Sequence, residues 1–348
     1  MRKDKVTARD VAKAAGVSPA TVSLVFRDKP GVGNETREHV LSVAHKLGFE
    51  YAGDIPHRKT STILLVIYKR HGQVVGETQF FETLTQGISD ATYRYGYHRL
   101  SISYFYAQEH PSEQLKALAS IKCAGIILLA TEMHSKDITQ FTRLGVPIVL
   151  LDSWFPTKDL DAIVIDNMCG AWEAVRYLHS MGHSDIGYLS SKVGIRNFLE
   201  RRQGYLAAMA DIGQSDNPTT HKIVRVGPAV EDACMDMLAY LGANPQLPTA
   251  FFADNDLIAI GCMRALEDND IRVPNDISII GFDNVSMSML TKAPLTTMEV
   301  PKERMGALAV QRLIELIKER TGGETVRISV KPRIVERMSV ARAGEVQQ

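Results

Sequence analysis

The chain has 348 residues, 45% of them hydrophobic, and a formal net charge of zero, which is enough material for a small domain and a large two-lobed body. The charge divides unevenly: residues 1–60 contain 11 lysines and arginines against 7 aspartates and glutamates, a basic balance that suits attraction of phosphate groups to this part. Four scattered cysteines without a CxxC pair argue against a zinc module or a disulfide framework. Neither a secretory signal nor a run of roughly 20 apolar residues is found, so we expect a soluble cytoplasmic protein.

The first two predicted helices are short and joined by a tight turn. Thr7 can cap the first helix, and Asp10 stands where a capping-box acceptor belongs. Gly16 suits the reversal of the backbone between the helices. Ser18 caps the second helix, and Pro19 occupies its first position. Helices this short cannot bury a core alone, but the second has the form of a helix that enters a DNA major groove.

A third helix is predicted from Thr36 to Leu47. Apolar residues recur along it at helical spacing, and Gly48 ends the run. Its apolar stripe can close a three-helix core with the first two helices, which predicts an all-α head over residues 1–50. The alternative is a generic capped hairpin, or an N-terminal extension that only packs on the main body.

The rest of the chain alternates strands and helices. Several of the apolar runs are apolar throughout, as is typical of strands buried on both faces of a parallel sheet. Amphipathic stretches that end at Gly96 and Gly182 separate some of them. The strands are too many for one comfortable open sheet, so we expect two doubly wound α/β lobes. The predicted strands cover residues 61–68, 98–106, 123–131, 146–152, 162–166, 185–191, 222–227, 249–254 and 276–283.

Polar residues stand at the ends of several predicted strands. Ligands of such lobes bind outside the carboxyl ends of the strands, and carboxylates and amides there can bond several hydroxyl groups. The alternative is that each residue caps the helix that follows. The pattern favours binding for Asp152 and Asp283, and it leaves both roles open for Asn167 and Asp254. The strand-end residues are Asp152, Asp166, Asn167, Asp254, Asn255, Asp256, Asp283 and Asn284.

The spacing of the reactive residues does not match that of a known enzyme motif. His179 and His183 are four residues apart, but Gly182 between them ends the helix, so a zinc pair is not expected. No G-x-S-x-G elbow, P-loop or dinucleotide fingerprint is found. We predict no catalytic residue, cofactor or metal, although a cytosolic sugar-binding receptor or an enzyme with an unrelated helical head stays an alternative.

The chain resembles the LacI-type (lactose/purine repressor) family of transcriptional regulators. The resemblance rests on VTARDVAKAAGVSPATVSLVF and ETREHVLSVAHKLGF near the N-terminus, and on ERRQGY, FFADNDLIAIG, DISIIGFDN and APLTTM in the body. It implies a homodimer that binds a pseudo-palindromic DNA operator, with a periplasmic-binding-protein-like body that closes on a small effector. It also implies that the regulator is a repressor. The predicted parts are a head (1–50), a linker (51–61) and a body (62–340), with an N-lobe of 62–165 plus 295–322 and a C-lobe of 166–294 plus 323–340.

The resemblance also implies roles in DNA binding. Pro19, Ala20 and Leu24 match positions that choose bases, and Ser18, Thr21 and Ser23 match positions that contact phosphates. Leu24 can touch a thymine methyl group but cannot pair with guanine, and its alternative role is packing in the helix core. The predicted DNA-binding residues are Thr7, Ser18, Pro19, Ala20, Thr21, Ser23, Leu24, Arg27, Thr36, Ile55 and Arg58.

The linker departs from the family pattern. The family has a hinge helix here whose leucine wedges into the minor groove, but this linker is several residues shorter. Gly53 and Pro56 disfavour a regular helix. Ile55 is the remaining candidate for kinking a base step, and Arg58 can meet a phosphate. We therefore expect a partly extended linker.

The family's effector contacts map onto the strand ends and one aromatic pair. An aromatic plate together with Asp, Asn and Arg suits a sugar or sugar derivative, although a nucleobase or an amino-acid-derived effector stays open. Phe81 has core packing as an alternative role, and Ala229 stands where the family has a further aromatic contact. The predicted effector-binding residues are Phe80, Phe81, Asp152, Trp154, Arg201, Asn255 and Asp283.

Overall fold

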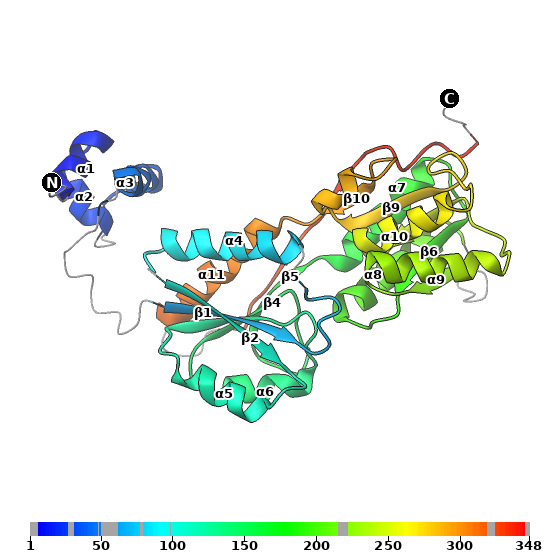
Figure 1. Cartoon of the computed structure of the whole chain (residues 1–348). Helices are drawn as coiled ribbons and strands as arrows, with labels where there is room; N and C mark the ends of the chain where they lie inside the picture. The colour runs from blue at the N-terminus through cyan, green and yellow to red at the C-terminus, as the bar shows by residue number, and fades with distance from the viewer. Residues whose placement is uncertain are drawn as a thin grey trace, which may run out of the picture. The chain divides into compact units, whose positions relative to one another are not determined.

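The computed structural model describes residues 6–26, 31–47, 49, 62–76, 79–97, 99–214, 222–318 and 324–344. The chain divides into two units, Met1–Ser61 and Thr62–Gln348 (Figure 1). The predicted linker with Ile55 and Arg58 lies outside the described residues, as does Arg27. No helix in the described ranges has the length and apolar character needed to cross a membrane.

The first unit contains three helices: α1 (Ala8–Ala15), α2 (Pro19–Phe26) and α3 (Asn34–Leu47). The capping box that Thr7 and Asp10 were predicted to form is present, and Gly16 ends α1 in the left-handed region with φ 67°. The Oγ atom of Ser18 accepts a hydrogen bond from the backbone N–H of Thr21 at 3.0 Å, so Ser18 caps α2. The three helices share one apolar core, which confirms the compact trihelical head.

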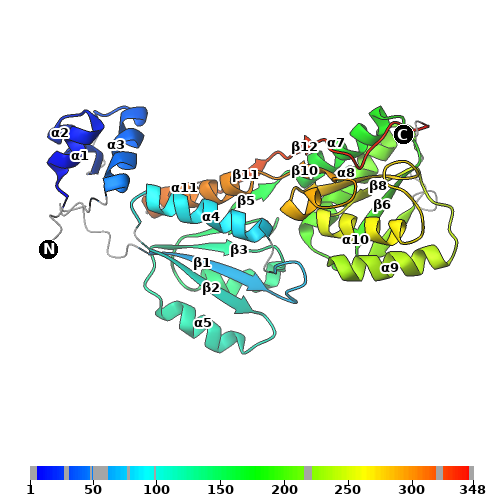
Figure 2. The ribbon, with the colours of Figure 1, turned by 45° about the horizontal axis from the view of Figure 1, so that its top comes forward.

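The N-lobe of the second unit is a parallel sheet between two layers of helices. Its strand order is β11-β5-β4-β3-β1-β2, with α4 and α11 on one face and α5 and α6 on the other (Figures 1 and 2). Its strands are β1 (Thr62–Lys69), β2 (Arg99–Tyr106), β3 (Gly125–Leu129), β4 (Ile148–Leu151), β5 (Asp161–Ile165) and β11 (Arg327–Val330). Its helices are α4 (Gln79–Arg94), α5 (Pro111–Ser120), η1 (Ser135–Asp137), α6 (Ile138–Thr142) and α11 (Lys302–Lys318).

The C-lobe repeats this architecture with the strand order β12-β10-β9-β8-β6-β7, in which only β12 pairs antiparallel among the described strands. Its strands are β6 (Ile186–Ser191), β7 (Ile223–Val226), β8 (Ala250–Ala253), β9 (Ser278–Asp283), β10 (Thr296–Glu299) and β12 (Arg333–Val335). Its helices are α7 (Asn167–Ser180), α8 (Arg196–Asp211), α9 (Val230–Gly242), α10 (Asp256–Glu267) and η2 (Ser286–Met289).

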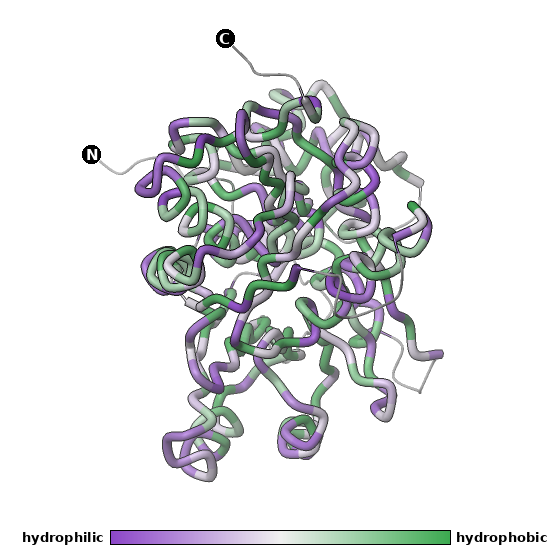
Figure 3. Tube along the Cα trace, turned by 90° about the vertical axis from the view of Figure 1, so that its right-hand side faces the viewer, coloured by the Kyte–Doolittle hydropathy of each residue, from purple (hydrophilic) through white to green (hydrophobic). Residues whose placement is uncertain are grey.

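All nine predicted strands are present within a few residues of their expected limits. The central strands β3, β4 and β8 are buried along their whole length, because helices cover both faces of each sheet. Figure 3 shows the same pattern: hydrophobic stretches, in green, run through the interior of the body, whereas the outlying helices alternate between green and purple (hydrophilic) residues. The α/β prediction for the body is confirmed.

Two of the predicted crossings between the lobes are wrong. The expected N-lobe segment began at residue 295, but β10 pairs with β9 of the C-lobe, so the chain crosses after β10. The expected C-lobe segment began at residue 323, but β11 pairs with β5 of the N-lobe, and the chain returns before β12. Short strands of this kind lack the long apolar run that identifies a central strand, so their sheet is decided by tertiary pairing.

Helices α4 and α11 approach each other through glycine. A Cβ atom added at Gly87 would overlap the backbone of Glu303, so Gly87→Ala is expected to lower the free energy of unfolding by about 1–3 kcal/mol. Gly242, at the end of α9, has open space around it, so Gly242→Ala is expected to be neutral or to stabilise by up to about 1 kcal/mol. Chemical denaturation of both variants measures the two effects, and equal stabilities would contradict the close packing of α4 on α11 at Gly87.

Candidate functional site

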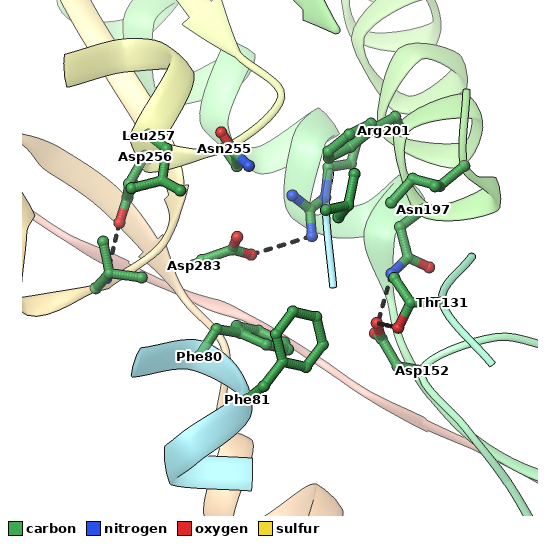
Figure 4. Close-up of a pocket in the computed structure, with 14 residues that line it drawn as sticks. Phe80, Phe81, Thr131, Asp152, Asn197, Arg201, Asn255, Asp256, Leu257 and Asp283 are labelled. Atoms are coloured by element: carbon green, nitrogen blue, oxygen red, sulfur yellow. Dashed lines mark hydrogen bonds and ion pairs between the residues drawn. The ribbon is translucent and has the colours of Figure 1, made fainter. Parts of the chain in front are cut away.

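The candidate effector site is a pocket where strand ends of both lobes meet. The N-lobe supplies the start of α4 and the end of β4, and the C-lobe supplies α8, the start of α10 and the end of β9 (Figure 4). The free space between the side chains is about 50 Å³. The lining residues are Val74, Phe80, Phe81, Thr131, Asp152, Ile195, Asn197, Phe198, Arg201, Asn255, Asp256, Leu257, Asp283 and Val285.

Asp152 is held at the end of β4 by hydrogen bonds from both lobes. Its carboxylate accepts one from the Thr131 hydroxyl at 2.6 Å and one from the Asn197 amide at 2.9 Å. Burial raises the pKa of Asp152 to about 6, although these bonds and the nearby Arg201 oppose the shift. The residue has φ 63°, a backbone region that is costly for a residue with a Cβ atom and is often found at binding sites. Asp152 therefore joins the lobes and presents acceptor oxygens to the pocket.

Arg201 is the centre of a buried polar network in the C-lobe. Its guanidinium donates to the Asn167 side chain at 2.9 Å, to the backbone carbonyl of Asp254, and to the Asp283 carboxylate at 3.1 Å. The same group lies 3.7 Å from the centroid of the Phe282 ring. Only 2% of Arg201 is exposed, so its donors are fixed in direction before any ligand arrives.

Asp283 and Asn255 complete the polar wall of the pocket. Asp283 ends β9 with φ 107°, and Figure 4 shows its carboxylate directed at Arg201. Burial raises the pKa of Asp283, while Arg201 and Lys302 act in the opposite direction. The side-chain oxygen of Asn255 caps α10 by accepting from the N–H of Ile258 at 2.9 Å. Asn255 thus both caps a helix and lines the pocket.

For Asn167 and Asp254 the sequence left open whether the residue caps a helix or binds a ligand, and in the structure neither of them caps the following helix. Asp166, not Asn167, caps α7, and Asn167 is buried against Arg201. Asp254 does not cap α10, since its carboxylate accepts from the Tyr188 hydroxyl and from the Ser191 N–H. Burial raises the pKa of Asp254 to about 6. The Asn167 side chain and the Asp254 backbone carbonyl each accept a hydrogen bond from Arg201, and neither residue is among those that line the pocket.

Phe80 and Phe81 form the apolar wall of the pocket. Their rings lie at 75° to each other with centroids 5.0 Å apart, in the first turns of α4. Both rings also belong to the main core of the body, so the two roles considered for Phe81 occur together. In Figure 4 the pair faces the polar groups Asp283 and Arg201.

Trp154, which was predicted to join the effector contacts, is not among the residues that line this pocket. Its indole ring lies between two guanidinium groups, that of Arg196 at 3.9 Å and that of Arg327 at 3.8 Å. Its N–H donates to Glu200 at 3.0 Å. Trp154 follows a strand of the N-lobe and Glu200 lies on a C-lobe helix, so this stack joins the lobes beside the pocket.

The predicted effector-binding set lacks three polar residues that line the pocket: Thr131, Asn197 and Asp256. Asn197 lies one helical turn before Arg201, so a search for residues on the same face of that helix would have found it. Thr131 shows no pattern of its own and is identified only by its bond to Asp152. Asp256 was noted at a strand end, and it holds Thr297 and the backbone of Val285.

Asp256 should make the stability of the body depend on pH. Burial raises its pKa from 3.8 to about 7, so its contribution is fully present below pH 4 and is lost as the pH rises through 7. The pKa values of Asp152 and Asp254 are raised in the same way. We expect the free energy of unfolding to fall between pH 5 and pH 8. Asp256→Asn should reduce this fall, because its amide is uncharged: its oxygen can accept from the Val285 N–H, and its NH2 group can donate to the Thr297 hydroxyl.

Chemical denaturation at the two pH values measures this difference. Asp268→Asn is the matched control, since Asp268 is exposed at the end of the same helix. An unchanged pH dependence in Asp256→Asn would contradict the assignment of the shift to this carboxyl group.

The candidate DNA-contacting surface lies on α2. Val22 and Val25 face the head core, whereas Ser18, Pro19 and Ala20 are exposed. Thr21, Ser23 and Leu24 are half-buried, and Leu24 is not among the described residues that pack on the core. Thr36 is exposed on α3, and the Thr7 hydroxyl is engaged with Asp10. The exposed side of α2 therefore carries short polar and small apolar side chains.

Comparison with known proteins finds matches in both units. Residues 7–50 match the bacterial regulatory proteins of the lacI family, and residues 175–340 match a periplasmic binding protein-like domain. The chain is 33% identical over 341 residues to the HTH-type transcriptional repressor PurR of Pasteurella multocida, a match that covers 96% of this chain and 98% of the relative. It is 29% identical over 337 residues to the HTH-type transcriptional regulator GalR of Escherichia coli, with 96% of both chains covered.

A solved structure resembles both units as well. The transcriptional regulator CelR in complex with cellobiose superimposes with a TM-score of 0.71 at 26% sequence identity. The superposition covers 96% of this chain and 100% of that one.

Proposed function

Because this chain belongs to the LacI family of bacterial regulatory proteins and is a DNA-binding transcriptional regulator, we propose that it is a repressor controlled by a carbohydrate effector. The effector binds in the pocket between the lobes and changes the affinity of the head for its operator. We propose repression, as opposed to activation, because several of the relatives are named repressors. The alternative of a receptor or enzyme with an unrelated head is set aside, because the match spans head and body together.

One observation supports the choice of effector: two carboxylates and an oriented guanidinium face an aromatic pair. Asp152 and Asp283 offer acceptor oxygens, and Arg201 offers fixed donors. A sugar ring presents several hydroxyl groups at its edge and an apolar face, which fits a polar wall opposite Phe80 and Phe81. The CelR structure, which contains cellobiose, has the same two-lobed fold and supports this class of ligand.

Effector binding requires the lobes to move. The free space of about 50 Å³ is far below the roughly 300–1,000 Å³ that small-molecule sites offer. Hydrogen bonds join the lobes, from Asn197 to Asp152 and between Gln79 and Ser286. A sugar must replace or rearrange such bonds, so it favours one arrangement of the lobes over another. This differential affinity is what an effector needs to alter operator binding.

The operator is expected to be a pseudo-palindrome read by a homodimer. One helix of this kind contacts only a few base pairs. The two heads of a symmetric dimer contact two such half-sites, and the symmetry of the dimer sets the distance between them. Exposed apolar side chains at η2, with Leu290 82% exposed and Met289 56% exposed, are available for contact between subunits.

A ligand screen combined with an operator-binding assay tests the proposal. Mono- and disaccharides, nucleobases and amino acids are added to the full chain, and a binding ligand raises the unfolding temperature by mass action. The expected result is that one saccharide raises this temperature and changes the affinity for operator DNA. Stabilisation by a nucleobase alone would overturn the carbohydrate assignment. Tighter operator binding with the ligand would identify a corepressor, and weaker binding an inducer.

A further inference from the structure

A second hollow lies in the C-lobe, between the start of α8 and the neighbouring strands β6 and β7. Its free volume is about 340 Å³, near the lower end of the range of roughly 300–1,000 Å³ for small-molecule sites. This is far more than the space in the effector pocket. Strand ends of a doubly wound sheet are the usual place for a ligand, and the function proposed above makes no use of this hollow.

Two arginines line the hollow from different elements, Arg202 from α8 and Arg225 from β7. Both side chains are exposed, and neither guanidinium makes a hydrogen bond or an ion pair with the described part of the chain. No aspartate or glutamate is found among the described residues of the lining. Two positive groups beside one hollow without a counter-charge attract an anion.

The other lining groups define what kind of anion fits. Ser190 lies next to Arg225 in the register of β6 and β7, and its hydroxyl can donate a further hydrogen bond. Phe198, Leu199 and Ile223 form an apolar part of the lining, with Leu199 59% exposed. Guanidinium groups bind phosphate with two parallel hydrogen bonds. We propose that this hollow is a second ligand site, which binds a small organic phosphate through Arg202, Arg225 and Ser190.

The second site shares a wall with the effector pocket. Ile195 and Phe198 line both hollows. Phe198 also contacts the effector-site arginine, since the Arg201 guanidinium lies 5.6 Å from the centroid of its ring. Helix α8 therefore presents Arg201 to one site and Arg202 to the other. A phosphate ligand that orders this helix alters effector affinity, and the effector alters phosphate affinity by the same factor.

Calorimetry on the full chain tests the second site. Glucose 6-phosphate is the probe. Glucose, which lacks the phosphate group, and inorganic phosphate, which lacks the organic part, are the comparison ligands. Binding of glucose 6-phosphate is expected in the wild type and to weaken about tenfold or more in Arg202→Gln and in Arg225→Gln. Arg264→Gln is the matched control, because Arg264 is an exposed arginine of the same lobe outside the hollow. It is expected to bind like the wild type.

Three results would overturn the proposal. They are no binding of glucose 6-phosphate at millimolar concentration, equal affinity in all four proteins, and tighter binding of inorganic phosphate than of the organic phosphate. Arg201→Lys separates this site from the effector pocket. Loss of glucose 6-phosphate binding in Arg201→Lys alone places the phosphate between the lobes and contradicts the second site, whereas a changed response to a saccharide in that variant concerns only the proposed effector.

Discussion

Replacing Arg201 with alanine is expected to abolish the effector response and to spare DNA binding by the head. The guanidinium is buried and holds Asn167, Asp254 and Asp283. Its removal takes the ion-pair partner from the Asp283 carboxylate and leaves only Lys302 as a nearby positive charge, at a cost in the free energy of unfolding of about 3–5 kcal/mol. The loss of two or more charged hydrogen bonds from the pocket should weaken effector binding by about 100-fold or more. Calorimetry with the saccharide found in the screen measures this effect.

Asp283→Asn separates loss of binding from loss of folding. The asparagine keeps the size of the side chain and an acceptor oxygen for Arg201, so the body should fold while the effector affinity still falls. Arg264→Ala removes an exposed arginine of the same lobe outside the pocket and should leave the affinity unchanged. Undiminished effector affinity in both Arg201→Ala and Asp283→Asn would rule out this pocket.

Removing the hydroxyl groups of Thr21 and Ser23 is expected to weaken binding to operator and to random DNA by similar factors. Hydroxyls near the start of α2 are suited to phosphates, and phosphate contacts hold the helix in register without reading bases. Each hydrogen bond to a charged group is worth about 1.5–3 kcal/mol, so the double variant Thr21→Ala, Ser23→Ala should lose about 100-fold or more in affinity. Fluorescence anisotropy with both DNAs at one fixed salt concentration measures the loss.

Leu24→Ala should act differently, by changing which sequence is bound. Its side chain is half-exposed and lies outside the packed core of the head, so the head keeps its stability while an apolar contact to a base is lost. Ser42→Ala is the control, because Ser42 is an exposed serine of α3 outside the predicted set. An unchanged sequence preference in Leu24→Ala together with unchanged affinity in the double variant would contradict the assignment of α2 as the reading helix.

Local chemistry in the sequence accounts for the head and for most of the strands. A capping box or a left-handed glycine involves residues only a few positions apart, and Thr7 with Asp10 and Gly16 behave as predicted. Strands buried on both faces are identified by their apolar runs because each must contact a helix layer on either side. The strand-end rule in turn placed Asp152 and Asp283 at one pocket.

Pairing between distant segments was decided only in the tertiary structure. The bonds that hold Arg201 join α8 to Asn167 and to the ends of β8 and β9, and sequence spacing carries no record of such partners. The same reason explains Trp154, whose two neighbouring arginines come from α8 and β11, and the short strands β10 and β11 that shift the crossings. Turns, helix caps and the periodicity of apolar residues depend on residues close together in the chain, so they can be predicted from the sequence. The direction of a buried polar side chain depends on whichever distant group satisfies it, and that requires the folded molecule.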